Sequence, residues 1–306
     1  MTRRTSLHVL AGMTFRGVAR CFDTADIASS VGFRVAASLS LVSDVNMNDA
    51  RAAMRSWATE IAKMAGMEAD PTSQPLLAPE RLTEMVRKGN VDAFAATTPE
   101  YLKVAAFTDP HSLWVDRGFV EAGEEYLILT HDQSSLRSVP DLSGHELLLF
   151  TNPSTCLAAN WLEGLLDTAN LASPNVFFKQ ILPVAKLTRA VLPVYFRQTA
   201  ACLVTRRGYT TMIEMNPDLS RKLRVVATSP KLIPICMAIH KNCPPESKTR
   251  FTTALAKLHD TPAGKQLLAL FQSSGVARVE NALLGSSEEI VRTAERIRIR
   301  AARLGH

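Results

Sequence analysis

Two short hydroxyl-rich segments stand where a predicted strand gives way to a predicted helix. Asn152-Pro153-Ser154-Thr155 follows the apolar run at 146–150, and Thr97-Thr98-Pro99-Glu100-Tyr101 follows the run at 91–96. The first N–H groups of a helix have no partner inside it, and with the helix dipole they favour an anion. Serine and threonine hydroxyls add directed donors without adding charge. These segments are therefore the best candidates for binding a small oxyanion.

Each segment also has a simpler interpretation as a helix cap. A hydroxyl oxygen of Ser154 or Thr98 can accept a hydrogen bond from the first turn, which needs no ligand. For either segment alone we favour capping, but two such segments could close together on one small anion. The candidate ligand-binding residues of the two segments are Asn152, Ser154, Thr155, Thr97, Thr98 and Tyr101.

Two cationic positions could neutralise a bound anion. Lys186 precedes an apolar helix, and Arg206-Arg207 follows the strand that ends at Thr205. Lysine and arginine form charge-assisted hydrogen bonds to anionic oxygens. For each charge alone, and particularly for Arg207, solvated surface is the favoured interpretation.

Catalytic and metal-binding templates are absent from the sequence. There is no GxGxxG, GxxxxGK[ST], HExxH or GxSxG motif, and no two of the seven histidines stand at metal-ligand spacing. The five cysteines contain no CxxC pair; Cys202 and Cys236 lie in apolar runs and are predicted core thiols. We therefore expect a protein that is not an enzyme and that has no cofactor and no metal.

Composition bounds the class of protein. The 306 residues are 46% hydrophobic and 21% charged, with a formal net charge of +6. At about 150 residues per domain this length suggests two domains. No apolar run approaches the roughly 18 residues of a membrane-spanning helix. No aromatic residues interleave with a basic cluster, so we expect no nucleic-acid partner.

The N-terminal 32 residues are excluded from fold prediction. Thr2-Arg3-Arg4 followed by the short apolar stretch at 7–12 resembles an export signal, and a disordered leader or a misplaced start is the alternative. We expect a periplasmic protein, with the cytoplasm as the alternative.

Two α/β units follow in series. The first has predicted strands at 34–42, 76–77 and 91–96. Between the first two strands a helix carries apolar residues at steps of 4, 3, 4 and 3, namely Ala50, Met54, Trp57, Ile61 and Met64. This β-α-β-α-β-α order predicts a parallel sheet covered by helices.

The second unit has predicted strands at 126–130, 146–150, 201–204 and 223–227, an apolar segment at 177–181, and helices at 157–165 and 188–196. A strand at 233–240 and helices at 251–258 and beyond 262 could return to the first unit. A solvated helix is predicted at 286–304. Together these elements predict a two-lobed α/β architecture with a cleft between the lobes.

A series of landmarks resembles the phosphate/phosphonate solute-binding proteins of ABC transporters, the PhnD-like family. The match covers about residues 33–275, and its specificity comes from the order and spacing of landmarks that are weak singly. The landmarks are Asn46 with Asp49-Ala50, Gly89–Phe94, Asp141–Gly144, Pro153–Thr155 (the family's "S-T-S" helix start), Asn216–Leu219, Ser229-Pro230 with Ile233-Pro234, and His259–Lys265.

The resemblance implies a type II periplasmic-binding-protein fold with a hinge between two lobes. One lobe would span 33–118 plus 231–280 and the other 119–230, with 281–306 as a C-terminal helical extension. Hinge closure would capture a small phosphorus oxyanion and present it to a membrane permease. We expect a monomer. A sensory binding protein of the same fold, which signals to a partner protein, is the alternative.

Departures from the family pattern fall at the expected site. Thr205 stands where the family commonly has a cleft-facing acidic residue, Lys186 where it often has histidine, and Cys156 where it has the last serine of "S-T-S". Thr199-Ala200-Ala201 stands in place of the family's "V-D-A". Without the acidic residue an amino group on the ligand would lack a counter-charge. We therefore expect phosphate, phosphite or a related oxyanion, with Thr205 and Lys186 among the ligand-binding residues.

Overall fold

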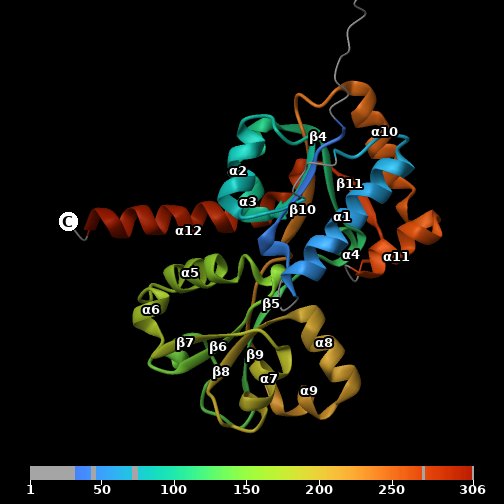
Figure 1. Ribbon diagram of the computed structural model, residues 1–306. Helices are drawn as coiled ribbons and strands as arrows, with labels where there is room; N and C mark the ends of the chain where they lie inside the picture. The colour runs from blue at the N-terminus through green and yellow to red at the C-terminus, as the bar shows by residue number, and fades with distance from the viewer. Residues whose placement is uncertain (1–31, 43–45, 71–74, 271–272, 305–306) are drawn as a thin grey trace, which may run out of the picture. The chain divides into compact units, whose positions relative to one another are not determined.

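The computed structural model describes residues 32–42, 46–70, 75–270 and 273–304 of the chain (Figure 1). The expected leader lies outside these residues except for Gly32. Within the described part the strands form two separate sheets, one of six strands and one of five. No helix of this part is both long enough and apolar enough to span a membrane.

The first sheet has the strand order β11-β4-β10-β3-β1-β2. Its strands are β1 (Val35–Ser38), β2 (Leu76–Leu77), β3 (Ala93–Thr97), β4 (Thr108–Asp116), β10 (Ile235–His240) and β11 (Val276–Val279). As the β-α-β order predicts, β1 pairs in parallel with both β2 and β3. The sheet is nevertheless mixed, because β10 inserts antiparallel between β3 and β4.

Helices cover both faces of this sheet. They are α1 (Met47–Met64), α2 (Pro79–Arg87), α3 (Thr98–Leu102), α4 (Arg117–Ala122), α10 (Pro245–Ala256) and α11 (Pro262–Leu270). Four of the five apolar residues predicted to share one face of α1 are buried, and Met64 is half-buried. Alternate residues of a strand point to opposite faces, so Ala93 packs with the α1 and α10 side chains and Phe94 with those of α2.

The second sheet has the strand order β7-β6-β8-β5-β9. Its elements are β5 (Tyr126–His131), β6 (Glu146–Phe150), α5 (Ala158–Thr168), α6 (Pro174–Phe177), β7 (Gln180–Val184), α7 (Leu187–Tyr195), β8 (Ala201–Thr205), α8 (Arg206–Met215), α9 (Asp218–Lys222) and β9 (Leu223–Thr228). Because β6 is parallel to both β7 and β8, the carboxyl ends of these three strands lie at one sheet edge. That edge carries Asn152, Lys186 and Thr205.

Two crossing segments, the first at residues 123–125 and the second at residues 229–234, connect the sheets. Glu124 and Leu232 pair across them through two backbone hydrogen bonds of 2.8 Å each. Gly123 precedes this pair with a φ of +68°, and a Cβ added there would lie 2.7 Å from the Lys231 Cβ. Glycine is therefore required at this position both by its backbone conformation and by the close approach of the second segment.

The C-terminal helix α12 (Gly285–Leu304) corrects one expectation. The helix predicted at 286–304 is present and mostly exposed, but one face packs against α5 and α3 and buries Ser287, Val291 and Ala294 (Figure 1). The Ser287 Oγ accepts a hydrogen bond of 2.8 Å from the Ile233 N–H on the second crossing segment. Arg298 and Arg300 pair with Glu163 and Asp167 of α5.

Other boundaries differ from those predicted. The strand expected at 34–42 ends at Ser38 and continues as a 3-10 turn, Leu39–Leu41. The apolar segment at 177–181 is divided between α6 and β7. Strands β4 and β11 were not predicted. The buried thiols of Cys202 and Cys236 confirm the predicted core positions.

Candidate functional site

The segment Asn152–Cys156, here the NPSTC segment, follows β6 and leads through a 3-10 turn into α5. Asn152 and Thr155 cap each other. The Asn152 Oδ1 accepts from the Thr155 N–H at 3.0 Å, and the Thr155 Oγ1 accepts from the Asn152 N–H at 2.9 Å. Both side chains are thereby engaged within the protein, as the capping interpretation expects.

Ser154 is the exception within the NPSTC segment. It is half-buried, and its hydroxyl makes no hydrogen bond with any residue in the described part of the chain. Its carbonyl oxygen accepts a hydrogen bond of 2.7 Å from the Tyr126 hydroxyl. The backbone of Ser154 is therefore held while its hydroxyl stays free to donate to a ligand.

Cys156 ends the NPSTC segment against the second crossing segment. Its Sγ donates to the Pro234 carbonyl at 3.2 Å. Burial raises the pKa of this thiol to about 12, so it is protonated at neutral pH. The residue that replaces the family's last serine thus bonds to the protein rather than standing free.

The segment Thr97–Tyr101, here the TTPEY segment, follows β3 and forms the start of α3. Thr98 is fully buried. Its N–H donates to the Pro234 carbonyl at 2.7 Å, and its Oγ1 donates to the Ile233 carbonyl at 2.5 Å. Tyr101 is 2% exposed, its hydroxyl oxygen lies 3.4 Å from the Thr108 Oγ1, and burial raises its pKa. Both side chains are bonded to or buried in the protein.

Glu100 is a buried carboxylate that the sequence analysis did not assign to the site. Its Oε1 accepts from the Ser38 Oγ and its Oε2 from the Thr97 N–H, both at 3.0 Å. It ties the carboxyl end of β1 to that of β3. The sequence contained a signal for this role of Glu100, because Thr97 followed by glutamate three residues later is a capping-box pattern.

The remaining predicted residues lie at the edge shared by β6, β7 and β8. Thr205 is buried and caps α8, its Oγ1 accepting from the Gly208 N–H at 3.2 Å. Lys186 stands exposed at the N-terminus of α7, and its ammonium has no bonding partner among the described residues. The structure thus brings Asn152, Thr205 and Lys186 to one edge.

Arg206 and Arg207 each contact another side chain. The Arg206 Nε donates to the Glu125 Oε2 at 2.5 Å. The Arg207 guanidinium lies over the Phe119 ring, 4.9 Å from its centroid. The Arg207 N–H points to Glu124, a carboxyl group whose pKa is raised by burial. Of the candidate cations named from the sequence, Lys186 is the one with neither an ion pair nor a ring contact among the described residues.

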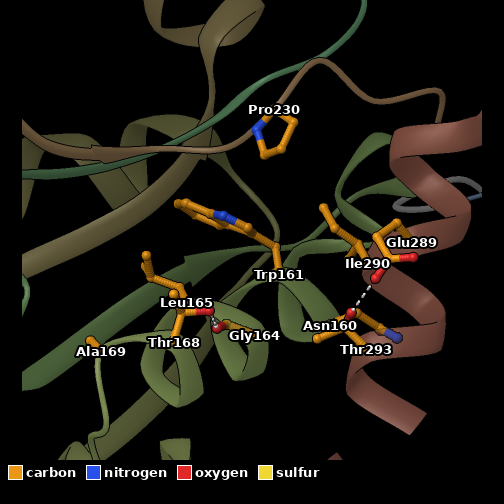
Figure 2. A pocket seen from close by; sticks show the side chains of 10 residues that line it. All are labelled: Asn160, Trp161, Gly164, Leu165, Thr168, Ala169, Pro230, Glu289, Ile290 and Thr293. Atoms are coloured by element: carbon orange, nitrogen blue, oxygen red, sulfur yellow. Dashed lines mark hydrogen bonds between the residues drawn. The ribbon is translucent and has the colours of Figure 1, made fainter. Parts of the chain in front are cut away.

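Two cavities lie beside α12 and away from the predicted residues. One, of about 390 Å³, is lined by α5 from Asn160 to Ala169, by Pro230 and by α12 around Ile290 (Figure 2). The other, of about 520 Å³, lies between α5, α6 and the outer half of α12. Neither contains a residue of the NPSTC or TTPEY segment. Among the described residues no group of three His, Cys, Asp or Glu side chains is arranged to hold a metal ion.

Comparison with known proteins identifies the family. A model of the family described as "ABC transporter, phosphonate, periplasmic substrate-binding protein" matches residues 39–284. The chain belongs to this family, whose members are the periplasmic, phosphonate-binding components of ABC transporters. The resemblance noted from the landmarks is thereby confirmed. Among curated proteins, none matches the chain.

Solved structures share the fold at low identity. XAC2383 from Xanthomonas citri, bound to chloride, is 15% identical with a TM-score of 0.63, over 88% of this chain and 99% of that one. PhnD1 from Prochlorococcus marinus, in complex with methylphosphonate, is 13% identical with a TM-score of 0.60. The match covers 86% of this chain and 98% of that one. A binding protein of a phosphonate ABC transporter from Pseudomonas aeruginosa is 14% identical with a TM-score of 0.58. The match covers 88% of this chain and 89% of that one. These likenesses confirm the predicted two-lobed periplasmic-binding-protein fold.

Proposed function

We propose that the protein captures a small phosphorus oxyanion, namely phosphate, phosphite or a simple phosphonate, at the NPSTC segment and delivers it to an ABC permease. The free hydroxyl of Ser154 carries this proposal. The NPSTC segment is a turn at the start of a helix, where unpaired N–H groups favour an anion. Within the segment the Asn152 Oδ1, the Thr155 Oγ1 and the Cys156 Sγ are engaged by protein groups. The Ser154 hydroxyl is the hydroxyl that remains available to donate to a ligand, beside the Nδ2 of Asn152.

Lys186 supplies the charge in this proposal. It is exposed, unpaired, and at the sheet edge that carries the NPSTC segment. Hinge closure at the two crossing segments then brings the first-sheet half of the protein over the bound anion. Lobe boundaries at residues 118–119 and 230–231 belong to the same proposal, as do the monomeric state and export by the N-terminal segment.

The charge around the site disfavours a ligand with an amino group. Thr205 replaces the acidic residue that would pair with such a group. The one buried carboxylate of the TTPEY segment, that of Glu100, already accepts two hydrogen bonds from Ser38 and Thr97. A ligand ammonium would have to compete with both donors, so we expect simple anions to bind more tightly than aminoalkylphosphonates.

A thermal-shift screen of the full chain tests the proposal. The ligands are phosphate, phosphite, methylphosphonate, aminoethylphosphonate and sulfate, with buffer alone as reference. A ligand that binds only the native state at one hundred times its Kd stabilises it by about 2.7 kcal/mol. We expect a rise in Tm with at least one phosphorus oxyanion, lost in Ser154→Ala and kept in Ser143→Ala, an exposed serine of the same half. No rise with any phosphorus oxyanion would contradict the proposal and favour the sensory alternative.

A further inference from the structure

We infer that Tyr126 is a positioning residue that couples the two crossing segments to the oxyanion site. The inference rests on the proposed binding role of the NPSTC segment. Tyr126 is the first residue of β5, two residues beyond the Glu124–Leu232 pair. It was not among the residues that the sequence marked for the site.

The side chain of Tyr126 is attached to the NPSTC segment. Its hydroxyl donates to the Ser154 carbonyl at 2.7 Å and accepts from the Leu157 N–H at 3.4 Å. One phenol oxygen therefore spans the turn from Ser154 to the start of α5. The residue is fully buried, and burial raises the pKa of the phenol well above its ordinary value, so the hydroxyl remains a donor at neutral pH.

The backbone of Tyr126 is attached to the second crossing segment. Its N–H donates to the Ser229 Oγ at 2.8 Å, and its carbonyl accepts from the Ser229 N–H at 2.9 Å. Ser229 immediately precedes the residues that cross back to the first sheet. Both crossing segments therefore meet at Tyr126.

The ring of Tyr126 holds the link rigid. It packs against Trp161 of α5 with a centroid separation of 6.1 Å, in the buried core that includes Ile128 and Leu157. A buried ring has few rotatable bonds and is fixed by its neighbours. A shift of the crossing segments therefore displaces the carbonyl of Ser154, the residue whose hydroxyl is free for the ligand.

Substitution of Tyr126 by phenylalanine isolates the hydroxyl, and Tyr209→Phe is the matched control. Tyr209 is also buried and also donates its hydroxyl to a backbone carbonyl of the second-sheet half, that of Leu219 at 3.2 Å. Titration calorimetry of the full chain would use inorganic phosphate and methylphosphonate, with urea unfolding of each protein in parallel. We expect similar losses of stability in both variants. We expect Kd to rise about tenfold in Tyr126→Phe, equivalent to 1.4 kcal/mol, and to stay unchanged in Tyr209→Phe.

The Kd, compared with the stability-matched Tyr209→Phe control, is the readout that a purely structural role would not move, and hydrogen exchange shows where the loosening falls. In Tyr126→Phe the amides at 154–158 should exchange faster, while those of α7 and β8 keep their wild-type rates. Equal Kd values in the two variants and the wild type would overturn the inference and leave the proposed function standing. A wild type that binds neither anion would overturn both. Should Tyr126→Phe fail to fold, Ser229→Ala must show the weaker binding, and unchanged binding there would overturn the inference.

Discussion

The TTPEY and NPSTC segments look alike in sequence and differ in what surrounds them. Each follows a parallel strand, contains adjacent hydroxyl residues and a proline, and opens a helix. In the TTPEY segment the Thr98 hydroxyl and the Glu100 carboxylate bond to protein groups and are buried. In the NPSTC segment the Ser154 hydroxyl is unpaired and half-buried.

On the proposed function, this difference separates a structural junction from a binding site. The partners of the TTPEY segment come from far along the chain, because Ile233 and Pro234 of the second crossing segment accept from Thr98. In the NPSTC segment Asn152 and Thr155 cap each other, and Cys156 bonds to Pro234. The hydroxyl of Ser154 is left without a protein partner. A hydroxyl-rich helix start becomes a site only where its neighbours leave a donor free.

The largest effect is expected from Glu100→Ala in the TTPEY segment. The substitution leaves the buried Ser38 hydroxyl and the Thr97 N–H without an acceptor, which should cost about 3 kcal/mol of unfolding free energy. Urea unfolding measures this loss. The control is Glu80→Ala on α2, an exposed residue whose replacement should change stability by less than about 0.5 kcal/mol. Equal stability of the two variants would show that the carboxylate does not hold the segment together.

Thr98→Val should have a smaller effect on stability and none on binding. It removes the bond from Oγ1 to the Ile233 carbonyl, which still accepts from Ser287 at 3.2 Å. We expect a loss of about 1 kcal/mol in unfolding free energy. Thr211→Val, at an exposed position of α8, is the control for the change of side chain. Loss of anion affinity in Thr98→Val would mean that the TTPEY segment contacts the ligand.

Lys186→Gln should weaken anion binding modestly and in a salt-dependent way. An exposed charge contributes little, so we expect about a threefold rise in Kd at low ionic strength. Since the Debye length falls to about 3 Å at 1 M salt, the difference from wild type should disappear there. Calorimetry at low and high salt measures it, with Lys265→Gln on α11 as control. A salt-independent loss would instead indicate a direct, buried contact.

Glu124→Gln should have the smallest effect, seen only as a change in the pH dependence of stability. Burial raises the pKa of Glu124 above its ordinary value of 4.5. The native state then holds this proton more tightly than the unfolded chain. The stability it contributes is present below pH 4.5 and is lost as pH rises through the raised pKa. Urea unfolding from pH 4 to 8 should show a flatter decline in Glu124→Gln, whereas a decline identical to wild type would contradict the assignment.

Periodicity in the sequence predicted the elements that carry strong patterns. The 4-3-4-3 spacing located α1, and the apolar runs located β3, β5, β6 and β8. Strand β4 was not predicted because Asp109, Pro110 and His111 interrupt the apolar pattern of its first half. Strand β11 was not predicted because it is only four residues long. The buried face of α12 had a visible signal, since Ser287, Val291 and Ala294 are spaced by four and three.

The candidate site was predictable as a location and not as a set of contacts. Strand–helix junctions and the family landmarks predicted that Asn152–Thr155, Lys186 and Thr205 lie near one another, and the parallel pairing of β6, β7 and β8 does bring them to one sheet edge. Thr98 could not be separated from Ser154, because its partners lie 135 residues away. The contacts of Tyr126 with the NPSTC segment were not predicted, because no local sequence pattern indicates which groups a buried tyrosine at a strand end will contact.

The most direct test of the contrast between the two segments is a calorimetric titration of inorganic phosphate and methylphosphonate into wild type, Ser154→Ala and Thr98→Val, with the Tm of each protein measured in parallel. Loss of a hydrogen bond to a charged ligand should raise Kd by about tenfold or more in Ser154→Ala while its Tm stays unchanged. Thr98→Val should keep the wild-type Kd and lose stability. Wild-type affinity in Ser154→Ala together with weakened binding in Thr98→Val would contradict the account.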